Sequence, residues 1–360
     1  MGITAEQIKT LAQDCGFELA GIAAAGPHED FARFEEWRAA GNAGEMKYLT
    51  DGRGDLRADP RNLLPEAKTM VCVGKLYNTG EPGTNPNPER GWISRYAWGR
   101  DYHEIVRTAL EGLVRRIEQV HAEPFEWRIC VDTAPLLERS YARSAGLGWI
   151  GKNSCLINQQ RGSWFFLGEL LLSIPLAPDA PPPDRCGTCR RCIDACPTAA
   201  IVTNERGGWT LDARLCISYL TIEKRGDVPP ELTPMMSNHV FGCDICQDVC
   251  PWNGHAPVTS DENFAAQAPS VWLEELAGLT ADGFREVFRR SPVWRTKYEG
   301  FLRNVATAMG NSSDAGMMGA LEKLAQHPSE VVARAASRAM ELLAKSAWPA
   351  NCQVDRRDAI

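Results

Sequence analysis

The chain lacks any apolar run long enough to cross a membrane, although 44% of its 360 residues are hydrophobic. A membrane helix needs ~20 consecutive apolar residues. The longest candidate here, residues 164–175, is interrupted by Gly168 and Glu169. The amino-terminal stretch MGITAEQIKTLAQDCGFELAGIA has no basic region before an apolar core, so it does not resemble a secretory signal. We therefore expect a cytoplasmic protein with no membrane partner.

The chain also lacks an excess of positive charge, since its formal net charge is −7 at pH 7. That balance argues against nucleic-acid binding by the whole surface but leaves room for a local basic face. Residues 285–303 could form one. The basic residues there are Arg285, Arg289, Arg290, Arg295, Lys297 and Arg303, against the acids Glu286 and Glu299, with Trp294 and Tyr298 between them. Such a stretch is typical of a phosphate-binding face with stacking side chains, and the alternative is a solvated helix face.

Cysteine, by contrast, is abundant: the chain has 13, and eight of them fall within residues 186–250. The first run, CGTCRRCIDACP, has the C-x2-C-x2-C-x3-C-P spacing of bacterial ferredoxins. The second run, CDICQDVCP, lacks its first cysteine because Val240 stands there, and we expect Cys216 to replace it. Eight thiolates are the number that two [4Fe–4S] clusters need.

The spacing also predicts which cysteines serve which cluster, because the fourth cysteine of each ferredoxin run ligates the other cluster. One cluster would use Cys186, Cys189, Cys192 and Cys250, and the other Cys196, Cys216, Cys243 and Cys246. Zinc is one alternative, but zinc sites pair two C-x2-C runs and leave the evenly spaced cysteines before Cys-Pro unexplained. Disulfides are the other alternative, and we do not expect them in a chain without a secretory signal.

Hydrophobic periodicity predicts an α/β (α+β) fold for the first half of the chain. Residues 69–76 and 164–174 suit buried strands, and residues 102–120 have the pattern of an amphipathic helix. A second helix is expected over residues 134–145, and residues 41–56 read as a loop.

A proline-rich linker at residues 175–183 separates this half from the cysteine-rich module. After residue 264 we expect helices only, over residues 301–309, 316–325 and 331–343, which resemble HEAT-like repeats. The expected domains are 1–176, a ferredoxin-like module at 177–258, and a helical domain at 259–346, followed by a loosely ordered tail at 347–360.

Seven stretches of the chain carry a resemblance to a known family. They are RADPRNLLPEAK from Arg57, WGRDYH from Trp98, VDTAPLLER from Val131, GWIGKN from Gly148, GSWFFLGE from Gly162, LCISYLTIE from Leu215 and FGCDICQDVCPWN from Phe241. Through these stretches nearly the whole chain resembles the epoxyqueuosine reductases. The resemblance implies that the protein reduces epoxyqueuosine to queuosine at the wobble position of tRNA, the last step of queuosine biosynthesis, with electrons passing through two [4Fe–4S] clusters.

The resemblance further implies a cobalamin in the first domain, which would make residues 1–176 the catalytic domain. Nothing in composition or spacing indicates this cofactor. The D-x-H-x-x-G signature of histidine-ligated cobalamin is absent from the sequence, which fits a base-off cobalamin without a lower ligand from the protein. The implied partners are a tRNA carrying epoxyqueuosine and an external electron donor of the flavodoxin or ferredoxin type. We expect the protein to be a monomer.

Carried over by motif, Asp132 matches the family's proposed proton donor. Opening an epoxide leaves an alkoxide, and a carboxylic acid whose pKa is raised by burial can protonate it. From the residues alone, the alternative that Asp132 caps a helix beginning near Ala134 is equally good. The resemblance places the cobalamin contacts on Arg57, Ser94, Asp132, Leu156, Leu167, Ser218, Cys243 and Asp244. The leucines would act mainly through their backbone, and the alternative for the polar residues is a surface or turn position.

For tRNA, we expect contacts from Lys224, Arg225, Arg295, Lys297 and Arg303. His103, at the start of a helix, reads as a capping or packing residue. The alternative function is that of a reductive dehalogenase-like reductase of a small molecule, also dependent on cobalamin and iron–sulfur clusters. An enzyme of that kind would be expected to carry an export signal, and it would have no use for the basic stretch at residues 285–303. A non-catalytic electron carrier or tRNA-binding module would leave the first domain without a role.

Overall fold

The computed structural model describes residues 2–80, 87–266 and 270–346. The expected tail at 347–360 lies outside the described residues, and so does Cys352. The helices are α1 Ala5–Asp14, α2 Asp30–Ala39, α3 Lys47–Thr50, α4 Gly52–Asp55, α5 Tyr102–Val120, α6 Glu138–Ser144, α7 Arg191–Asp194, α8 Ile217–Ile222, α9 Ile245–Asp248, α10 Leu273–Ala277, α11 Ala281–Phe288, α12 Lys297–Asn311, α13 Met318–Ala325 and α14 Glu330–Ser346. The strands are β1 Leu19–Ala24, β2 Thr69–Leu76, β3 Arg90–Ile93, β4 Trp127–Cys130, β5 Trp149–Ile150, β6 Leu156–Ile157, β7 Phe165–Leu172, β8 Ile201–Thr203, β9 Trp209–Leu211, β10 His239–Phe241 and β11 Ser270–Trp272.

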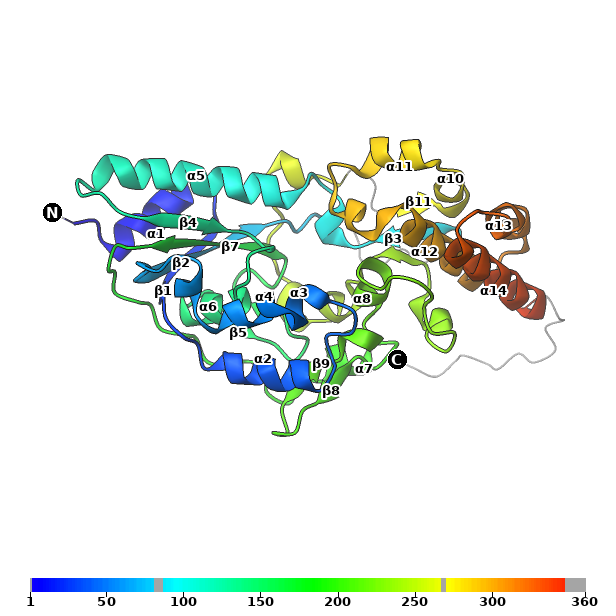
Figure 1. Cartoon of the computed structure of the whole chain (residues 1–360), viewed down its shortest axis with the longest axis horizontal. Coiled ribbons are helices and arrows are strands. Elements are labelled where there is room, and N and C mark those ends of the chain that lie inside the picture. Colours follow the sequence, from blue (N-terminus) through cyan, green and yellow to red (C-terminus); the bar gives the residue numbers. More distant parts are fainter. Residues whose placement is uncertain (1, 81–86, 267–269, 347–360) are drawn as a thin grey trace.

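The first half of the chain is built on a four-stranded sheet of order β1-β2-β7-β4, in which every neighbouring pair is antiparallel. Helices α1 and α5 cover one face and α6 covers the other, as Figure 1 shows. Every residue of β2 is buried, as the continuous apolar run predicts for a strand covered on both faces. The mixed α/β fold expected for this half is therefore confirmed, and its antiparallel pairing makes it the α+β form.

Helix α5 spans the residues expected from the periodicity. Asp101 caps it by accepting a hydrogen bond from the backbone of His103, and Val106, Leu110 and Leu113 lie on its buried face. Helix α6 is shorter than expected and begins only at Glu138, with no side-chain cap. The interpretation of Asp132 as a helix cap is thus wrong. The expected loop at residues 41–56 also differs, because it contains the short helices α3 and α4.

A second sheet joins parts of the chain that the sequence assigns to different domains. Its order is β10-β3-β11, so strands before residue 176, within 177–258 and after 259 pair with one another. Val240, which stands where a ferredoxin would carry a cysteine, is fully buried in this sheet and packs close to Gly91. Trp92 and Val240 share one hydrophobic core with α12 to α14. The expected boundaries therefore do not separate independent cores.

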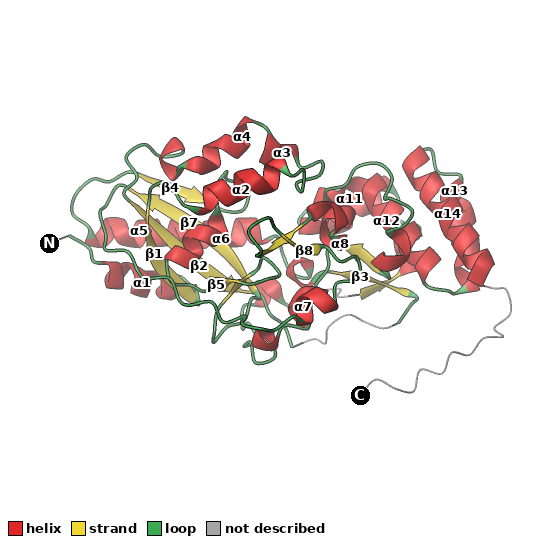
Figure 2. Cartoon of the chain, turned by 90° about the horizontal axis from the view of Figure 1, so that it is seen from below, coloured by secondary structure: helices red, strands yellow, loops and turns green. Residues whose placement is uncertain are grey.

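The carboxyl-terminal part is helical apart from β11, which the sequence analysis missed. Helix α12 runs through its centre, and residues 301–310 of this helix are all buried. Helices α13 and α14 pack on α12 at the end of the molecule far from the first sheet, as Figure 2 shows from a second direction. Among the residues described, no helix is long and apolar enough to cross a bilayer.

Candidate active site

A large cavity lies where the sheet of the first half meets the cysteine-rich segments. It encloses about 1410 Å³ of space between atoms, part of it open to solvent. Its apolar walls come from Tyr77, Tyr96, Tyr102, Phe165, Phe166, Leu156, Leu167, Ile201 and Ile245. Its polar groups include Asp132, Glu138, Ser94 and Ser218, together with the cysteines Cys196, Cys216, Cys243 and Cys246. One chamber thus brings a carboxylic acid close to the predicted cluster ligands.

Asp132 lies in the loop that follows β4 and adopts a left-handed backbone conformation, with φ of 51°. This region is uncommon for residues other than glycine, although aspartate and asparagine tolerate it best. Such strain is often found at functional sites, where the surrounding structure holds it in place. The loop turns the Asp132 side chain towards the start of α5, because its Oδ2 lies 3.1 Å from Nε2 of His103.

His103 is held between two carboxylates. Its Nδ1 lies 2.7 Å from Oδ1 of Asp101, and its Nε2 contacts Asp132. Burial would lower the pKa of His103, but the hydrogen bonds to Asp101 and Asp132 outweigh it and raise the pKa to about 9. His103 is therefore protonated at neutral pH, and the proton-bearing partner of Asp132 in the resting site is this imidazolium.

Arg295 reaches the same carboxylate from the carboxyl-terminal half. It lies in a short 3-10 helix, η8 (Pro292–Thr296), and its guanidinium is 3.7 Å from Oδ2 of Asp132. The Nε of Arg295 also contacts Glu223 at 2.6 Å, and its guanidinium stacks over the ring of Tyr48 at 5.3 Å. Arg295 was expected to bind tRNA, and the structure shows that it also contacts the candidate acid, Asp132.

The pKa of Asp132 is lowered, not raised as the sequence analysis expected. Burial would raise it, but the hydrogen bond from His103 and the positive charges of His103 and Arg295 lower it below its usual range. In the resting site the Asp132 carboxylate is ionised. Asp132 can therefore donate a proton only after it has received one from His103 or from another donor in the cavity.

The cysteines of the ferredoxin-like runs affect one another's ionisation. Burial raises the pKa of Cys192 to about 11, and the charges of Cys250, Cys186 and Cys189 add to this. Burial likewise raises the pKa of Cys243, with Cys216 and Cys196 adding to it. The pKa of Cys246 is also raised, first by a hydrogen bond with Cys155 and by burial, and then by the charges of Cys155, Cys243 and Cys216. The division of the eight cysteines between two clusters, with Cys216 in place of the missing cysteine, stays a prediction.

Six of the eight predicted cobalamin contacts line the cavity: Ser94, Asp132, Leu156, Leu167, Ser218 and Cys243. Asp244 and Arg57 are not among the lining residues. Asp244 is buried and accepts hydrogen bonds from the Ser94 hydroxyl at 2.5 Å and the Arg95 backbone at 2.7 Å, so it holds Ser94 in place. Arg57 is buried and donates to the carbonyl oxygens of Tyr48 and Arg53.

The predicted tRNA-binding residues differ in how accessible they are. Lys297 is exposed, whereas Lys224 forms an ion pair with Glu45. The guanidinium of Arg225 donates to the carbonyl oxygens of Arg295 and Thr296, at 3.0 Å each, and so joins the cysteine-rich segment to η8.

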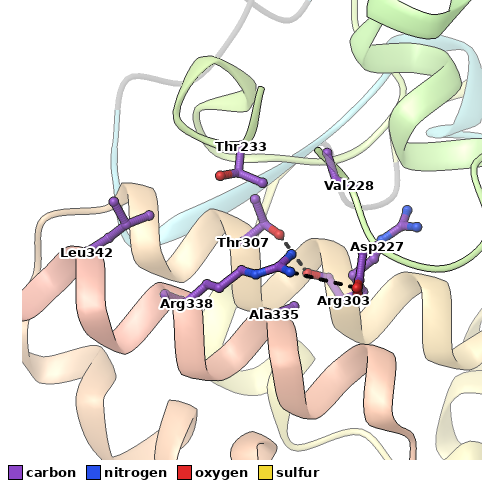
Figure 3. A pocket seen from close by; sticks show the side chains of 9 residues that line it. Asp227, Val228, Thr233, Arg303, Thr307, Ala335, Arg338 and Leu342 are labelled. Carbon is purple, nitrogen blue, oxygen red and sulfur yellow. Dashed lines mark hydrogen bonds and ion pairs between the residues drawn. The ribbon is translucent and has the colours of Figure 1, made fainter. Parts of the chain in front are cut away.

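Arg303 is only 2% exposed and does not fit the role expected of it. Its guanidinium donates to the carbonyl oxygens of Leu220, Lys224 and Gly226. Figure 3 shows the small pocket that Arg303 lines with Asp227, Thr307 and Arg338, inside the contact of α12 and α14 with the cysteine-rich segment. Because its donors are used inside the protein, Arg303 supports the fold and does not reach a tRNA phosphate.

The sequence analysis missed His103 and the buried acids Glu138 and Glu169. The Asp101-x-His103 pattern was a usable signal, because the carboxylate of an N-cap residue can reach a side chain two residues further on. Glu169 offered a signal as well, since it interrupts an otherwise apolar strand. Neither pattern shows by itself that the side chains meet Asp132, which lies on another loop.

The fold and this site define a class of protein: an iron–sulfur reductase in which cysteines of the ferredoxin-like runs line a cavity together with a carboxylic acid that contacts an imidazolium. Comparison with known proteins agrees. A family model described as a 4Fe-4S double cluster binding domain matches residues 185–253, and one described as "Epoxyqueuosine reductase QueG, DUF1730" matches residues 57–133. The chain belongs to the epoxyqueuosine reductase family, because curated members are 40–42% identical to it over more than nine-tenths of its length.

The similarity to curated relatives covers almost the whole chain. The epoxyqueuosine reductase of Xanthomonas campestris pv. campestris is 42% identical over 336 residues, which cover 91% of this chain and 93% of the relative. That of Escherichia coli K12 is 40% identical over 362 residues, covering 99% of this chain and 91% of the relative.

Solved structures of the family have the same fold. A crystal structure of epoxyqueuosine reductase with an epoxyqueuosine-modified tRNA-Tyr stem loop is 28% identical, has a TM-score of 0.85, and covers 94% of this chain and 89% of that chain. The Bacillus subtilis enzyme, solved with the loop of a catalytic aspartate swung out of the active site, is 27% identical with a TM-score of 0.84, covering 94% of this chain and 90% of that chain.

Proposed function

We propose that this protein reduces epoxyqueuosine to queuosine at the wobble position of tRNA. The observation that carries the proposal is that Asp132 lines one cavity with Cys196, Cys216, Cys243 and Cys246. A proton donor and an electron path thus meet in a single chamber. In support, the family to which the chain belongs includes a structure in complex with an epoxyqueuosine-modified tRNA stem loop.

We assign the clusters as the sequence predicts, with one [4Fe–4S] cluster on Cys186, Cys189, Cys192 and Cys250 and the other on Cys196, Cys216, Cys243 and Cys246. The raised pKa values of Cys192 and Cys243, due to burial and then to the other cysteines of each set, support this division. An external one-electron donor of the flavodoxin or ferredoxin type would supply electrons to the first cluster. The second cluster borders the cavity through Cys243, so electrons enter the chamber there.

We propose that the cavity holds a base-off cobalamin. Aromatic and aliphatic side chains form most of its walls, with a few polar groups between them, as is common in cofactor sites. Among its described lining residues there is no histidine or methionine that could serve as a lower ligand. Leu156, Leu167, Ser94 and Ser218 would hold the cofactor, with Asp244 fixing Ser94 from behind. When bound, cobalamin supplies a low-potential metal centre for reduction of the substrate.

The chain's own residues handle the protons. Removal of an epoxide oxygen as water consumes two electrons and two protons, and Asp132 lines the cavity where that oxygen must lie. His103, in contact with Asp132 at 3.1 Å, passes its proton to the ionised carboxylate, and Asp132 then gives that proton to the oxygen. Arg295 stabilises the carboxylate between these steps.

We further propose that residues 1–176 form the cobalamin-binding catalytic part, 177–258 the ferredoxin-like part, and 259–346 a HEAT-like part that holds the tRNA. The exposed residues Arg285, Arg289, Arg290 and Lys297, with Trp294 beside them, support a phosphate-binding face. Arg295 lies on the same segment and contacts Asp132, so this face leads directly into the cavity.

The test is conversion of epoxyqueuosine in tRNA by reconstituted protein and a reductant, followed by nucleoside mass spectrometry. The wild-type protein should yield queuosine. Asp132→Asn should abolish turnover while the iron and cobalamin contents stay unchanged. Asparagine is the matched choice because it tolerates the left-handed backbone of this position, whereas alanine would add strain. Unchanged epoxyqueuosine with the wild-type protein, or full activity in the variant, contradicts the proposal.

A further inference from the structure

Behind the cavity lies a buried pair of acids that the proposed mechanism does not use. Glu169 sits in the middle of β7, is 0% exposed, and pairs across the sheet with Cys72 of β2 and Cys130 of β4. Its side chain points to the face of the sheet that α6 covers, the same face as Leu167 of the cavity wall. Glu138, in the first turn of α6, meets it there and itself lines the cavity.

Among the described residues neither acid forms an ion pair, and Arg139 and Arg57 act on Glu138 only through their charge. Both carboxylate oxygens of Glu169 and Oε1 of Glu138 are buried without a hydrogen-bond donor among the described residues. An ionised carboxylate buried in this way costs several kcal/mol or more, so such a group remains neutral. Two ionised carboxylates are both acceptors and repel each other, whereas one shared proton turns their close contact into a hydrogen bond.

We propose that Glu138 and Glu169 share a proton at neutral pH and deliver it to the cavity, where it restores the proton that Asp132 gives up in turnover. The role of the pair in turnover rests on the proposed function, whereas the shared proton itself does not. In the balanced reaction, the two C–O bonds of the epoxide break, a carbon–carbon double bond forms, and the oxygen leaves as water with two electrons and two protons. The electrons come from the one-electron donor protein, the first proton comes from the Asp132–His103 pair, and the second from Glu138 and Glu169.

Charges around the pair favour this role. Burial raises the pKa of Glu138 to about 8, and the charge of Asp132 adds to this, while Arg139 and Arg57 lower it less. Burial also raises the pKa of Glu169 well above its usual value, with Glu138 and Asp132 adding to it. Three further titratable neighbours, Cys72, Cys130 and Tyr102, have pKa values raised mainly by burial and are neutral. Glu138 lies within hydrogen-bonding reach of the Asp132 backbone, so the acid pair adjoins the loop that carries Asp132.

The pair can be tested without the substrate, by infrared spectroscopy of the protein as a function of pH. The carbonyl stretch of buried, protonated carboxyl groups should be present at pH 7 and should weaken as the pH rises through about 8, the pKa of Glu138. Glu169→Gln keeps the shape of the neutral acid but has no proton to give, and should lose the part of this band that Glu169 contributes. A wild-type spectrum without a protonated carboxyl at pH 7 overturns the proposal.

The kinetic test is the pH profile of kcat with epoxyqueuosine tRNA. Glu169→Gln should reduce kcat at pH 7.5 by at least about tenfold, because the pair then has one proton-donating group fewer. Cys72→Ala is the matched control, since Cys72 lies directly across from Glu169. This control should lower the melting temperature without moving the pH profile.

The outcomes separate the two proposals. If the pH profile of Glu169→Gln superimposes on the wild-type profile, Glu169 has a purely structural role, and the proposal that the acid pair delivers a proton is contradicted. If instead the wild-type protein leaves epoxyqueuosine unchanged, the proposed function fails, while the infrared titration still decides whether the acids share a proton.

Discussion

His103 and Asp132 come from different elements, the start of α5 and the loop after β4, and meet with Nε2 and Oδ2 3.1 Å apart. Asp101 holds the other ring nitrogen, so the imidazole is fixed between two carboxylates. This ion pair joins the acid of the proposed reaction to a proton that is present at neutral pH.

Replacing His103 by glutamine should reduce kcat by about 100-fold, with little change in KM, because the proton beside Asp132 is lost. It should also change stability in a pH-dependent way. Because folding raises the pKa of His103 from 6.5 to about 9, its stabilisation is fully present below pH 6.5 and is lost as the pH rises through about 9. The variant should thus be less stable by on the order of 1 to 2 kcal/mol at pH 6, allowing for the partial exposure of the pair.

Urea unfolding of both proteins between pH 6 and pH 10 measures this difference. His255→Gln, at an exposed position, is the control and should show no such pH dependence. A stability difference that stays constant or grows above pH 9 would contradict the ion pair.

Replacing Cys216 by serine should remove one cluster and leave the other. Cys216 lies with Cys243 and Cys196, and we propose it as the fourth ligand of their cluster. The iron content of the reconstituted protein should fall by about half, and electron transfer to the cavity should stop. Cys15→Ser, at the end of α1, should keep the full iron content. Equal iron in the two variants would refute the ligand assignment.

Replacing Arg303 by methionine should destabilise the protein by about 3 kcal/mol or more, because three buried carbonyl oxygens lose their donor. Arg289→Met, on the surface beside α11, should change the free energy of unfolding by no more than about 0.5 kcal/mol. Denaturant unfolding measures both. A neutral Arg303→Met would mean that its hydrogen bonds do not support the fold.

Replacing Lys297 by glutamine should weaken tRNA binding and reduce its salt dependence. Each lost phosphate contact should lower the slope of log K against log salt by roughly 0.7 to 0.9. Lys323→Gln, on the exposed side of α13, is the matched control. Titrations with fluorescent tRNA at several salt concentrations give both slopes, and identical slopes would remove Lys297 from the tRNA face.

Several features could be predicted because they depend on residues close in sequence. The range of α5 follows from its 3.6-residue periodicity and the Asp101 cap, and β2 follows from one continuous apolar run. The boundaries of α6 could not be predicted in this way. The loop that precedes it is held by contacts with α5, and these contacts take Asp132 out of the helix.

The burial of individual side chains could not be predicted from the sequence either. Arg303 belongs by sequence to a basic stretch, yet tertiary packing buries it beneath the carbonyl oxygens of another segment. Glu169 reads as an interruption of an apolar run, and only the covering helix α6 makes it a buried acid facing a second acid. Neither result follows from residue type or spacing, because each depends on what packs above the side chain.

The sequence by itself determined the cysteine-rich module, the alternation of helices and strands, and the family. Ligand spacing, periodicity and long motifs are all written along one stretch of chain. Only the tertiary structure decided that His103, Asp132 and Arg295 meet at one cavity, and that Glu138 and Glu169 lie behind it. The physical reason is that the pKa of each group, and hence its chemistry, is set by burial and by charges brought in from distant parts of the chain.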